Sequence, residues 1–420
     1  MKNLRIGICG WGNIATGLYK TILENKDEIY SKSNLEIEIV AIGARRDNPK
    51  CIPENVVIER NIFDVLNHKI DVMIELIGGV DIARELILNS IDKGIDVVTA
   101  NKAVLFNHGD EIFQKARDKN VNILFESSVC AGTPIIKLLQ EELAANTISK
   151  ISGMLNGTSN FIMTKMEEGA NFDETLFLAQ ENGYAEPDPS FDIEGMDAAH
   201  KIGILSSLAF GTSLPPNEFY IEGIKSIESD DFMYAAEYGY TIKHLAVAAM
   251  INNYNVELRA HPVLISSSEY LSNLKGVRNG IEIETDLIGK MHIAGSGAGQ
   301  GSTASGIISD LVFIANKDKN VLKQQNKINK TKLIPFKDIE FRNYFHIKTN
   351  NANDIEKSVY KIFESFNVQT DVFEPKNKNN EDDSLIIISR LISESTKFDV
   401  INKLNKLENI NSLKTIRIEK

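Results

Sequence analysis

The sequence predicts an α/β protein whose N-terminal part is a doubly wound parallel sheet. Three observations lead to this prediction. Over residues 1–130, short apolar strands alternate with helical segments, a pattern typical of βαβ units. The glycine-rich stretch "GWGNIATG" follows the first strand directly. Beyond residue 130 the pattern changes to that of an α+β domain, and residues 339–420 read in the order βαββαβ.

The elements of the first part follow from the positions of apolar runs and glycines. The predicted strands are residues 4–9, 35–43, 71–79, 95–102 and 121–129, and helices are predicted at 18–26, 83–94 and 109–120. The strands are rich in β-branched residues, and two of the helices stop at a glycine or an asparagine. We therefore expect a dinucleotide-binding type of sheet over residues 1–130.

The rest of the chain divides at changes of composition. A helix is predicted at 133–145, a strand at 150–157, further helices up to Gly211, and antiparallel strands at 254–265 and 280–299. These give a substrate domain over residues 131–315. The Lys-, Asn- and Gln-rich stretch 316–338 is interpreted as a linker. Residues 339–420 form the last module, with helices at 353–365 and 396–407.

Composition excludes several classes of protein. The 420 residues are 43% hydrophobic and 25% charged, with a net charge of −12. This acidic balance argues against a nucleic-acid or anionic-membrane partner. No apolar run is long enough for a membrane span. The three cysteines, at positions 9, 51 and 130, are too scattered for a disulfide framework or a zinc site, so we expect a cytoplasmic protein.

The glycine-rich turn has the features of a Rossmann dinucleotide site. Gly10 and Gly12 are in G-x-G register, and Ala15 occupies the third small position. The first glycine permits a tight turn and the second lets the backbone approach a pyrophosphate, while alanine still allows close helix packing. Backbone N–H groups at the helix start would then hold the phosphates.

The end of the second predicted strand bears on the choice of cofactor. An NAD site of this type usually has an acid there, but this chain has Arg45 and Arg46. Arginine suits the 2′-phosphate of NADP. Asp47 follows immediately, so NAD stays an alternative.

A buried lysine is predicted after the acidic loop 183–196. On a helical projection, Lys201 lies 40° from Asp197, on the same face as Ile204, Leu205 and Leu208. An exposed ion pair with this spacing would favour the solvated face. The apolar face instead implies a partly desolvated lysine, whose pKa can move toward neutrality, as a general acid requires.

Two other polar stretches accompany it. Asn101 and Lys102 follow a strand's carboxyl end, where open α/β sheets bind ligands, so both are expected to face the cofactor and substrate. The stretch Asn156–Ser159 opens a helix, which Thr158 or Ser159 is expected to cap.

Together these residues resemble the homoserine dehydrogenase family. The resemblance runs from residue 4 to about residue 315. It is carried by "ELIGG", "VVTANKA", "FESSVCAGTPII", "NGTSNFIMTKM", "GYAEPDPSFDIEGMDAAHKIGIL" and "GSGAGQGSTASGIISDL". The block over residues 183–205 is the most specific of these motifs.

The resemblance implies roles for individual residues. Lys201 would be the proton donor, Lys102 would hold the substrate near the nicotinamide, and Asp192 would position Lys201. Glu186 and Asp197 would bind the substrate's amino group. The residues expected at the cofactor are Gly10, Trp11, Gly12, Asn13, Ile14, Arg45, Arg46, Ile77, Asn101, Lys102, Gly183 and Gly299. Sodium would be bound at Glu126, Val129, Ala131 and Thr133, although "VCAGTP" differs from the family's more glycine-rich loop.

The last module resembles an ACT domain, which in this family often senses threonine. ACT domains usually carry an Asp-x-Pro-Gly turn, and the corresponding "TNNANDIEKS" has no Pro-Gly. This argues against amino-acid inhibition and leaves a role in dimerisation. A homodimer or homotetramer is expected, because the apolar strands of the middle domain would need cover.

The expected reaction is the NADPH-dependent, reversible reduction of L-aspartate 4-semialdehyde to L-homoserine, in threonine and methionine biosynthesis. Two alternatives stay open. The opening "IGICGWGNIATG" also resembles diaminopimelate dehydrogenase, although nothing after about residue 50 supports that enzyme. A non-enzymatic alternative is an NADP-binding, ligand-sensing regulator. The complete set of lysine, aspartate and glutamate side chains favours an enzyme.

Overall fold

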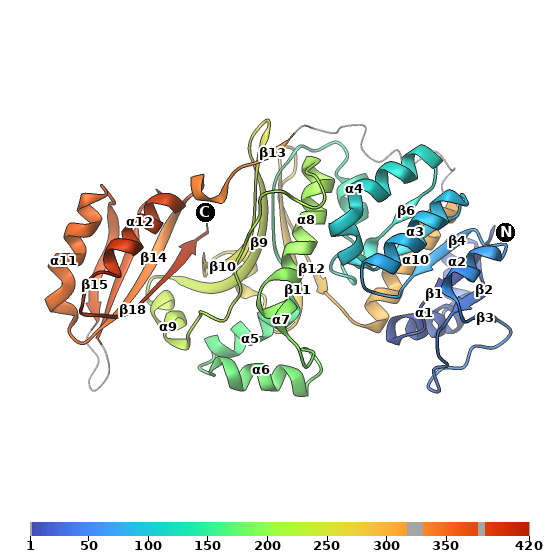
Figure 1. Cartoon of the computed structure of the whole chain (residues 1–420), viewed down its shortest axis with the longest axis horizontal. Coiled ribbons are helices and arrows are strands. Elements are labelled where there is room, and N and C mark those ends of the chain that lie inside the picture. The colour runs from blue at the N-terminus through green and yellow to red at the C-terminus, as the bar shows by residue number, and fades with distance from the viewer. Residues whose placement is uncertain (1, 317–330, 377–382, 420) are drawn as a thin grey trace. The chain divides into compact units, whose positions relative to one another are not determined.

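The computed structural model describes residues 2–316, 331–376 and 383–419 (Figure 1). As far as they are described, these residues form two compact units. The first consists of residues 1–149, 200–217 and 284–331, and the second of residues 150–199, 218–283 and 332–420. None of the described helices has the length and hydropathy that crossing a lipid bilayer requires.

The first unit is built on a parallel sheet with the strand order β3-β2-β1-β4-β5-β6. Its strands are β1 (Lys2–Cys9), β2 (Leu35–Gly43), β3 (Val57–Glu59), β4 (Val72–Glu75), β5 (Asp96–Thr99) and β6 (Ile123–Leu124). Its helices are α1 (Asn13–Glu24), α2 (Lys26–Ser33), η1 (Ile62–Asn67), α3 (Asp81–Asp92), α4 (Lys102–Lys119), η2 (Glu126–Ser128), η3 (Leu138–Glu142) and α10 (Gln300–Asn316).

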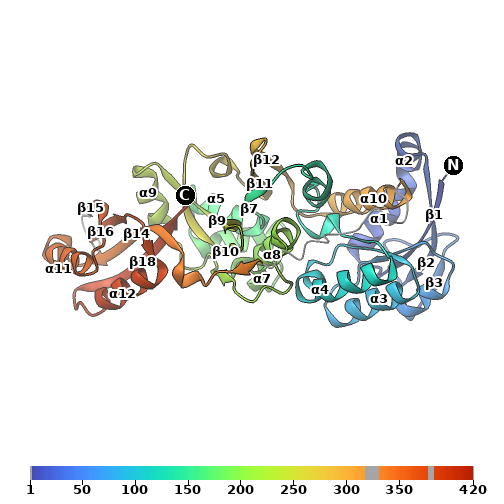
Figure 2. The same cartoon turned by 90° about the horizontal axis from the view of Figure 1, so that it is seen from above.

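Both faces of this sheet are covered, as in a doubly wound fold. Figure 2 shows α1 and α10 on one face and α3 and α4 on the other. The central strand β4 is buried at every position, which explains its continuous apolar run. The strand order reverses between β1 and β4, and ligands of such sheets bind at the carboxyl ends of the strands beside that point. The predicted Rossmann-like α/β fold is confirmed.

A second, mixed sheet follows the order β12-β11-β7-β9-β10-β18-β14-β16-β15. Its strands are β7 (Ile148–Met154), β9 (Tyr240–Asn252), β10 (Asn255–Ser266), β11 (Arg278–Thr285), β12 (Gly289–Ser296), β14 (Glu340–Thr349), β15 (Thr370–Lys376), β16 (Asp383–Ser389) and β18 (Ile410–Ile418), with the short β8 (Tyr220–Ile221), β13 (Lys332–Leu333) and β17 (Ile392–Ser393) alongside. The helices of this part are α5 (Gly157–Glu167), α6 (Phe172–Glu181), α7 (Ser190–Ile193), α8 (Met196–Phe210), α9 (Ser229–Glu237), η4 (Tyr270–Asn273), η5 (Phe336–Asp338), α11 (Ala352–Ser365) and α12 (Glu394–Leu404).

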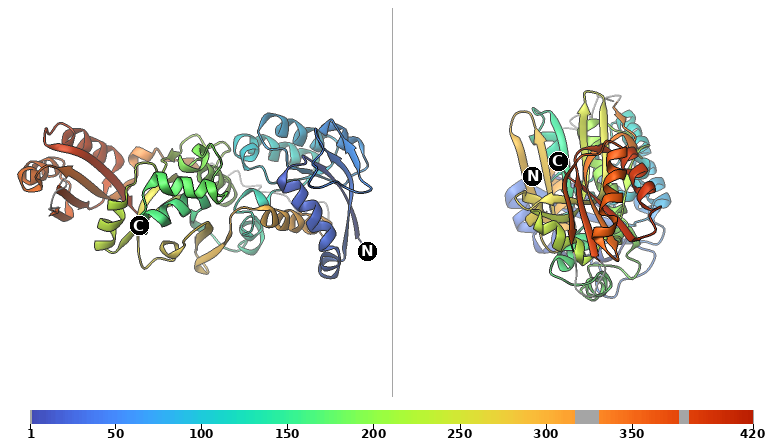
Figure 3. Two further views of the ribbon diagram at one scale, coloured as in Figure 1. Left: turned by 90° about the horizontal axis from the view of Figure 1, so that it is seen from below. Right: turned by 90° about the vertical axis from the view of Figure 1, so that its left-hand side faces the viewer.

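The C-terminal strands and helices follow the predicted βαββαβ order and are continuous with this sheet. Strand β18 pairs in parallel with β10 through Leu264 and Ile418. Successive residues of β14 point to opposite faces. Phe345 packs under α11 and α12, which lie together on one side of the strands (Figure 3). Tyr344 packs on the other side, in a core that also contains Ile162 of α5 and Phe232 of α9.

Some local predictions differ from the structure. The helix predicted at 133–145 is reduced to a short helical stretch whose main part is the π-helical turn η3. The predicted helix 109–120 is present as the part of α4 that follows a kink at His108, which has φ −134°. An additional helical segment from Lys102 precedes the kink, and the Asn101 side chain caps it by accepting the Val104 N–H at 3.2 Å. Of the stretch 316–338, residues 317–330 lie outside the described residues, and β13 and η5 lie within the remainder.

Candidate active site

The glycine turn after β1 leaves the start of α1 open to an anion. Gly10 has φ +106°, and a Cβ there would lie 2.5 Å from the Leu76 carbonyl oxygen. Gly12 is the N-cap of α1 and has no atom within 4 Å of its Cβ position. No acidic residue occupies the first turn of α1. Unpaired N–H groups and the helix dipole therefore make this turn a fit for a pyrophosphate.

The neighbouring glycine Gly299 belongs to the same turn region. It has φ +114° and directly precedes α10. The next residue, Gln300, donates from its side-chain nitrogen to the Asn13 carbonyl oxygen at 2.6 Å. This side chain also fills the space beside Gly17, where a Cβ would lie 1.9 Å from it. Two glycines far apart in the sequence are thus brought to one end of α1.

The arginines after β2 are available to a ligand. Arg45 and Arg46 are exposed, whereas Asp47 accepts a hydrogen bond from Arg60 at 2.6 Å. Trp11 donates its indole N–H to the Cys51 carbonyl at 3.2 Å, which fixes its ring beside the turn. The acid that could favour NAD is therefore paired with a cation at the surface, and neither arginine forms a hydrogen bond or ion pair with another described residue.

A buried carboxyl group organises the loops after β4 and β5. Glu75 accepts hydrogen bonds from the Ile77 N–H at 2.9 Å and from the Thr99 hydroxyl at 2.6 Å. Asn101 ties the two loops together by donating to the Gly79 carbonyl at 2.7 Å. Burial raises the pKa of Glu75, and these hydrogen bonds oppose the shift. The sequence indicated no role for this acid of "ELIGG" beyond its place as a charged residue at the end of an apolar strand.

Lys102 is placed by the same loops. It is the first residue of α4 and is partly buried. Its position at the carboxyl end of β5 agrees with the expected ligand-binding edge of the sheet.

In the second unit, the acidic loop is held by the start of α5. Asn156 donates to Asp192 Oδ1 at 2.7 Å and to Asp197 Oδ2 at 2.8 Å. Asp197 is buried and Asp192 is half-buried. Glu186 is exposed on the loop that follows Gly183, which has φ +70°. Asn156 therefore brings the carboxylates of Asp192 and Asp197 together. From the sequence, this asparagine was expected only to belong to an ordinary helix start.

Helix α8 carries Asp197 in its first turn and Lys201 one turn later. The Lys201 residue is only 7% exposed, so the predicted burial of this lysine is confirmed. The helix is apolar on more than one side, because Ala198, Ala199 and Ile202 are also fully buried. His200 stacks on Phe106 with ring centroids 4.1 Å apart.

The loop proposed to bind sodium is buried and strained. Cys130 has φ +50°, a conformation rare for a side chain other than glycine. The Glu126 carboxylate accepts the N–H groups of Ile136 at 2.8 Å and Lys137 at 3.1 Å. Val129 and Ala131 are buried, and the buried Thr133 hydroxyl has no hydrogen-bond partner among the described residues. An unsatisfied buried hydroxyl in this loop fits a monovalent cation. Within the described ranges, no cluster of three His, Cys, Asp or Glu residues has metal-ligand geometry.

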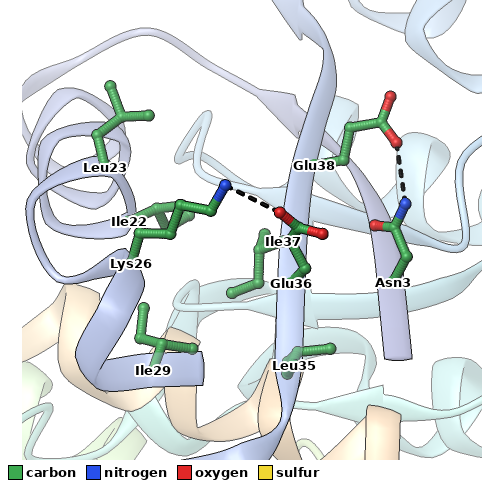
Figure 4. A pocket seen from close by; sticks show the side chains of 9 residues that line it. All are labelled: Asn3, Ile22, Leu23, Lys26, Ile29, Leu35, Glu36, Ile37 and Glu38. Atoms are coloured by element: carbon green, nitrogen blue, oxygen red, sulfur yellow. Dashed lines mark hydrogen bonds and ion pairs between the residues drawn. The ribbon is translucent and has the colours of Figure 1, made fainter. Parts of the chain in front are cut away.

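A separate hollow of about 340 Å³ lies elsewhere in the first unit (Figure 4). Its lining residues are Asn3, Ile22, Leu23, Lys26, Ile29, Leu35, Glu36, Ile37 and Glu38. Lys26 and Glu36 form an ion pair at 2.8 Å across it. The hollow lies at the amino ends of β1 and β2, the opposite edge from the glycine turn. It is therefore not the dinucleotide site.

The doubly wound sheet and its glycine turn define a dinucleotide-binding class of protein. The family model "Homoserine dehydrogenase, NAD binding domain" matches residues 10–126, and the model "Homoserine dehydrogenase" matches residues 134–312. The homoserine dehydrogenase of Pseudomonas aeruginosa is 38% identical over 432 residues, covering 100% of this chain and 99% of its own. The chain belongs to the homoserine dehydrogenase family, whose enzymes are oxidoreductases acting on a CH–OH group.

Solved structures agree with this assignment. A homoserine dehydrogenase from Thiobacillus denitrificans is 34% identical and matches with a TM-score of 0.93, covering 100% of this chain and 99% of that one. A hyperthermophilic archaeal homoserine dehydrogenase in complex with NADPH is 28% identical, with a TM-score of 0.63, over 74% of this chain and 97% of its own.

Proposed function

We propose that this homoserine dehydrogenase reduces L-aspartate 4-semialdehyde to L-homoserine with NADPH, reversibly, using Lys201 as the proton donor. The observation that carries the proposal is the burial of Lys201 on α8, one turn after the buried Asp197. Partial desolvation of a lysine at this position eases release of its proton, which the proposed role requires.

The chemistry balances with one hydride and one proton. NADPH, when bound, supplies the hydride that adds to the aldehyde carbon. The ammonium of Lys201 gives its proton to the developing alkoxide oxygen, and the reverse reaction returns the proton to the same nitrogen. Lys102 holds the substrate near the nicotinamide. Glu186 and Asp197 bind the substrate ammonium through charge-assisted hydrogen bonds, and Asp192 positions Lys201.

NADP is the proposed cofactor, with NAD as the alternative. The exposed Arg45 and Arg46 suit a 2′-phosphate, and Asp47 is engaged by Arg60. The archaeal relative's complex with NADPH supports the same choice. The groups proposed to contact the cofactor are those of the glycine turn (Gly10, Trp11, Gly12, Asn13 and Ile14), the two arginines, Ile77, Asn101, Lys102, Gly183 and Gly299.

A sodium ion is proposed at the loop 126–133. Glu126, Val129, Ala131 and Thr133 would hold it, and the unsatisfied Thr133 hydroxyl supports this site. The ion would stiffen the loop; it takes no part in the hydride or proton transfer.

Domain organisation and assembly are also proposals. The chain would divide into a Rossmann domain (1–130), a substrate domain (131–315), a linker (316–338) and an ACT-like domain (339–420) that does not sense threonine. A cytoplasmic homodimer or homotetramer is proposed. Its support is the βαββαβ module alone, because β9 and β10 are already buried along most of their length in a single chain.

One kinetic series tests these proposals. With homoserine as the substrate, formation of NADPH from NADP or of NADH from NAD is measured, with and without threonine, and with sodium or potassium as the cation. We expect a lower KM for NADP, no effect of threonine and activation by sodium. Replacing both Arg45 and Arg46 by alanine should raise the KM for NADP and not that for NAD. An equal rise for both cofactors would contradict the 2′-phosphate assignment.

A further inference from the structure

Asn156 occupies a position where its two side-chain atoms have separate tasks. It follows β7 and is the N-cap of α5. Its Oδ1 accepts the Ser159 N–H at 2.7 Å, which satisfies one of the free donors of the first helical turn. The residue is only 6% exposed. The cap fixes the plane of the amide group and therefore the direction of its Nδ2.

That Nδ2 donates to two carboxylates at once. It lies 2.7 Å from Asp192 Oδ1 and 2.8 Å from Asp197 Oδ2. The opposite orientation of the amide would turn an oxygen toward both carboxylates and an NH₂ toward the Ser159 N–H. Acceptors would then meet acceptors and donors would meet donors, so the chemistry allows only this orientation.

An uncharged bridge has a specific physical effect. Two carboxylates that share one nitrogen lie only a few ångströms apart and repel each other. A lysine or arginine at this position would hold them together but neutralise them. The amide holds them without adding a positive charge, so a bound cation is left to balance them.

The backbone of the acidic loop is anchored separately. The Ser159 hydroxyl donates to the Asp192 carbonyl oxygen at 3.0 Å, and the Thr158 hydroxyl donates to the Tyr184 carbonyl oxygen at 2.7 Å. These bonds do not depend on the Asn156 amide. Loss of the amide would remove these two bonds from the carboxylates while the loop stays attached to α5.

We propose that Asn156 is a positioning residue that sets the spacing of the Asp192 and Asp197 carboxylates for the substrate ammonium and the proton-donating lysine. This inference rests on the roles proposed above for Asp192 and Asp197. In this role Asn156 itself contacts neither the substrate nor the cofactor. Its effect should therefore appear in the binding of homoserine and in turnover, and not in the binding of NADP.

The test compares Asn156→Ser with a matched control, Asn171→Ser. Serine is also a good N-cap, so the exchange keeps the cap and removes the bridging amide. Asn171 caps α6 by accepting the Glu174 N–H at 2.9 Å and is exposed away from the two carboxylates. For Asn156→Ser we expect kcat/KM for homoserine to fall by about 10- to 100-fold, with an unchanged KM for NADP. The control should match wild type.

A second variant, Asn156→Asp, covers a failure of the serine variant to fold. Aspartate also caps helices well but turns an oxygen toward the two carboxylates. One of the three acids must then keep a proton, so the ratio of variant to wild-type kcat/KM should fall as the pH rises from about 6 to about 9.

Results that would overturn the role of Asn156 differ from the result that would overturn the proposed function. Wild-type kcat/KM for homoserine in Asn156→Ser would overturn the inference while leaving the reaction intact. So would a loss of kcat with both KM values unchanged and a lowered Tm, because that pattern indicates a structural role only. A constant activity ratio for Asn156→Asp across this pH range would also overturn it. Wild-type protein without homoserine-dependent NADPH formation would overturn the proposed function itself.

Discussion

Lys201 is the residue on which the proposed chemistry depends most. Lys201→Met keeps an unbranched side chain of similar length in the buried position and removes the proton. We expect kcat to fall by about 10²- to 10⁴-fold, the usual contribution of a general acid, with little change in the KM for NADP. Steady-state kinetics in both directions measure this. A variant with near-normal turnover would exclude Lys201 as the proton donor.

Replacing Gly10 by alanine should lower the stability of the protein, whereas replacing Gly12 by alanine should weaken cofactor binding. At Gly10 the new Cβ would lie 2.5 Å from the Leu76 carbonyl oxygen, with φ +106°, so we expect a loss of roughly 2 kcal/mol or more of stability. At Gly12 there is open space within the protein, so Gly12→Ala should fold normally and raise the KM for NADP about tenfold or more. Thermal unfolding and NADP titration separate the two effects, and equal stability of both variants would contradict this account.

Sequence patterns predicted which residues of the site are buried on a helix, but they missed the contacts between residues that are far apart in the chain. The burial of Lys201 and Asp197 followed from helical periodicity, which is local. The bridge made by Asn156 depends on acids 36 and 41 positions further along the chain, and no local pattern reports such a meeting. The role of Glu75 was missed in the same way, because its partner Thr99 lies on the next strand.

At the scale of elements, a buried charge cluster joins α12, β18 and the segment after β8. Arg417 of β18 donates two hydrogen bonds to Glu394, each at 2.9 Å, and a third to Glu222 at 2.7 Å. Lys397 also pairs with Glu394, at 2.7 Å. Burial, reinforced by the charge of Arg417, lowers the pKa of Lys397 to about 8. Arg417 is therefore the main partner of Glu394, and Lys397 is the weaker cation.

This cluster predicts a rise of stability in alkaline solution. Between pH 8 and the ordinary lysine pKa of 10.5, the folded protein has released the Lys397 proton while the unfolded chain keeps it. The free energy of unfolding should therefore rise with pH in this window, by up to about 3 kcal/mol, and should rise less in Lys397→Met. Urea midpoints at pH values of about 7.5 and 9.5 test this. Lys403→Met, at an exposed lysine of the same helix, is the control, and a parallel rise in all three proteins would refute the assignment.

Strands and helices were predicted well where burial and capping are local. The order of elements in the doubly wound sheet and in the βαββαβ module appeared as expected. The helical segment of α4 before the kink at His108 was not predicted; it begins at a cap by Asn101, which also bonds to Gly79 of a separate loop. The π-helical turn η3 replaced part of a regular helix beside Ile136 and Lys137, whose N–H groups donate to Glu126. The Asn101 cap is a local signal that the sequence contains, whereas the bonds of Glu126 join two separate segments of the chain, which local propensity does not encode.

At the scale of the whole molecule, the C-terminal module should be necessary for stability. Tyr344, Ile386 and Ile416 lie in the same core as residues of α5 and α9. Glu419 pairs with the buried Arg259 at 2.9 Å. Deleting residues 339–420 would expose this apolar surface and leave Arg259 without that partner, although the family models match only as far as residue 312.

We therefore expect the truncated chain to be insoluble or to lose its cooperative thermal transition. Soluble yield, calorimetry and size-exclusion chromatography measure this outcome. Glu419→Gln is the control for the ion pair alone and should be milder, because the apolar core stays intact. A truncated chain that unfolds at the wild-type temperature would mean that the module is only an appendage.

The division of the chain into compact units could be predicted only in part. Helix α10 is distant in sequence from the strands it covers, and tertiary contacts such as those of Gln300 with Asn13 and of Asp310 with Glu126 reveal the connection. Apolar periodicity shows that a helix has a face to bury but not which surface receives it.

The interleaving of the two units has a practical consequence. The chain passes from one unit to the other five times, at residues 149, 199, 217, 283 and 331. No single cut in the gene can yield either unit as one continuous fragment. Expression of separate halves should fail even where each unit has its own core, and recombination between relatives would have to exchange several segments together to keep both cores complete.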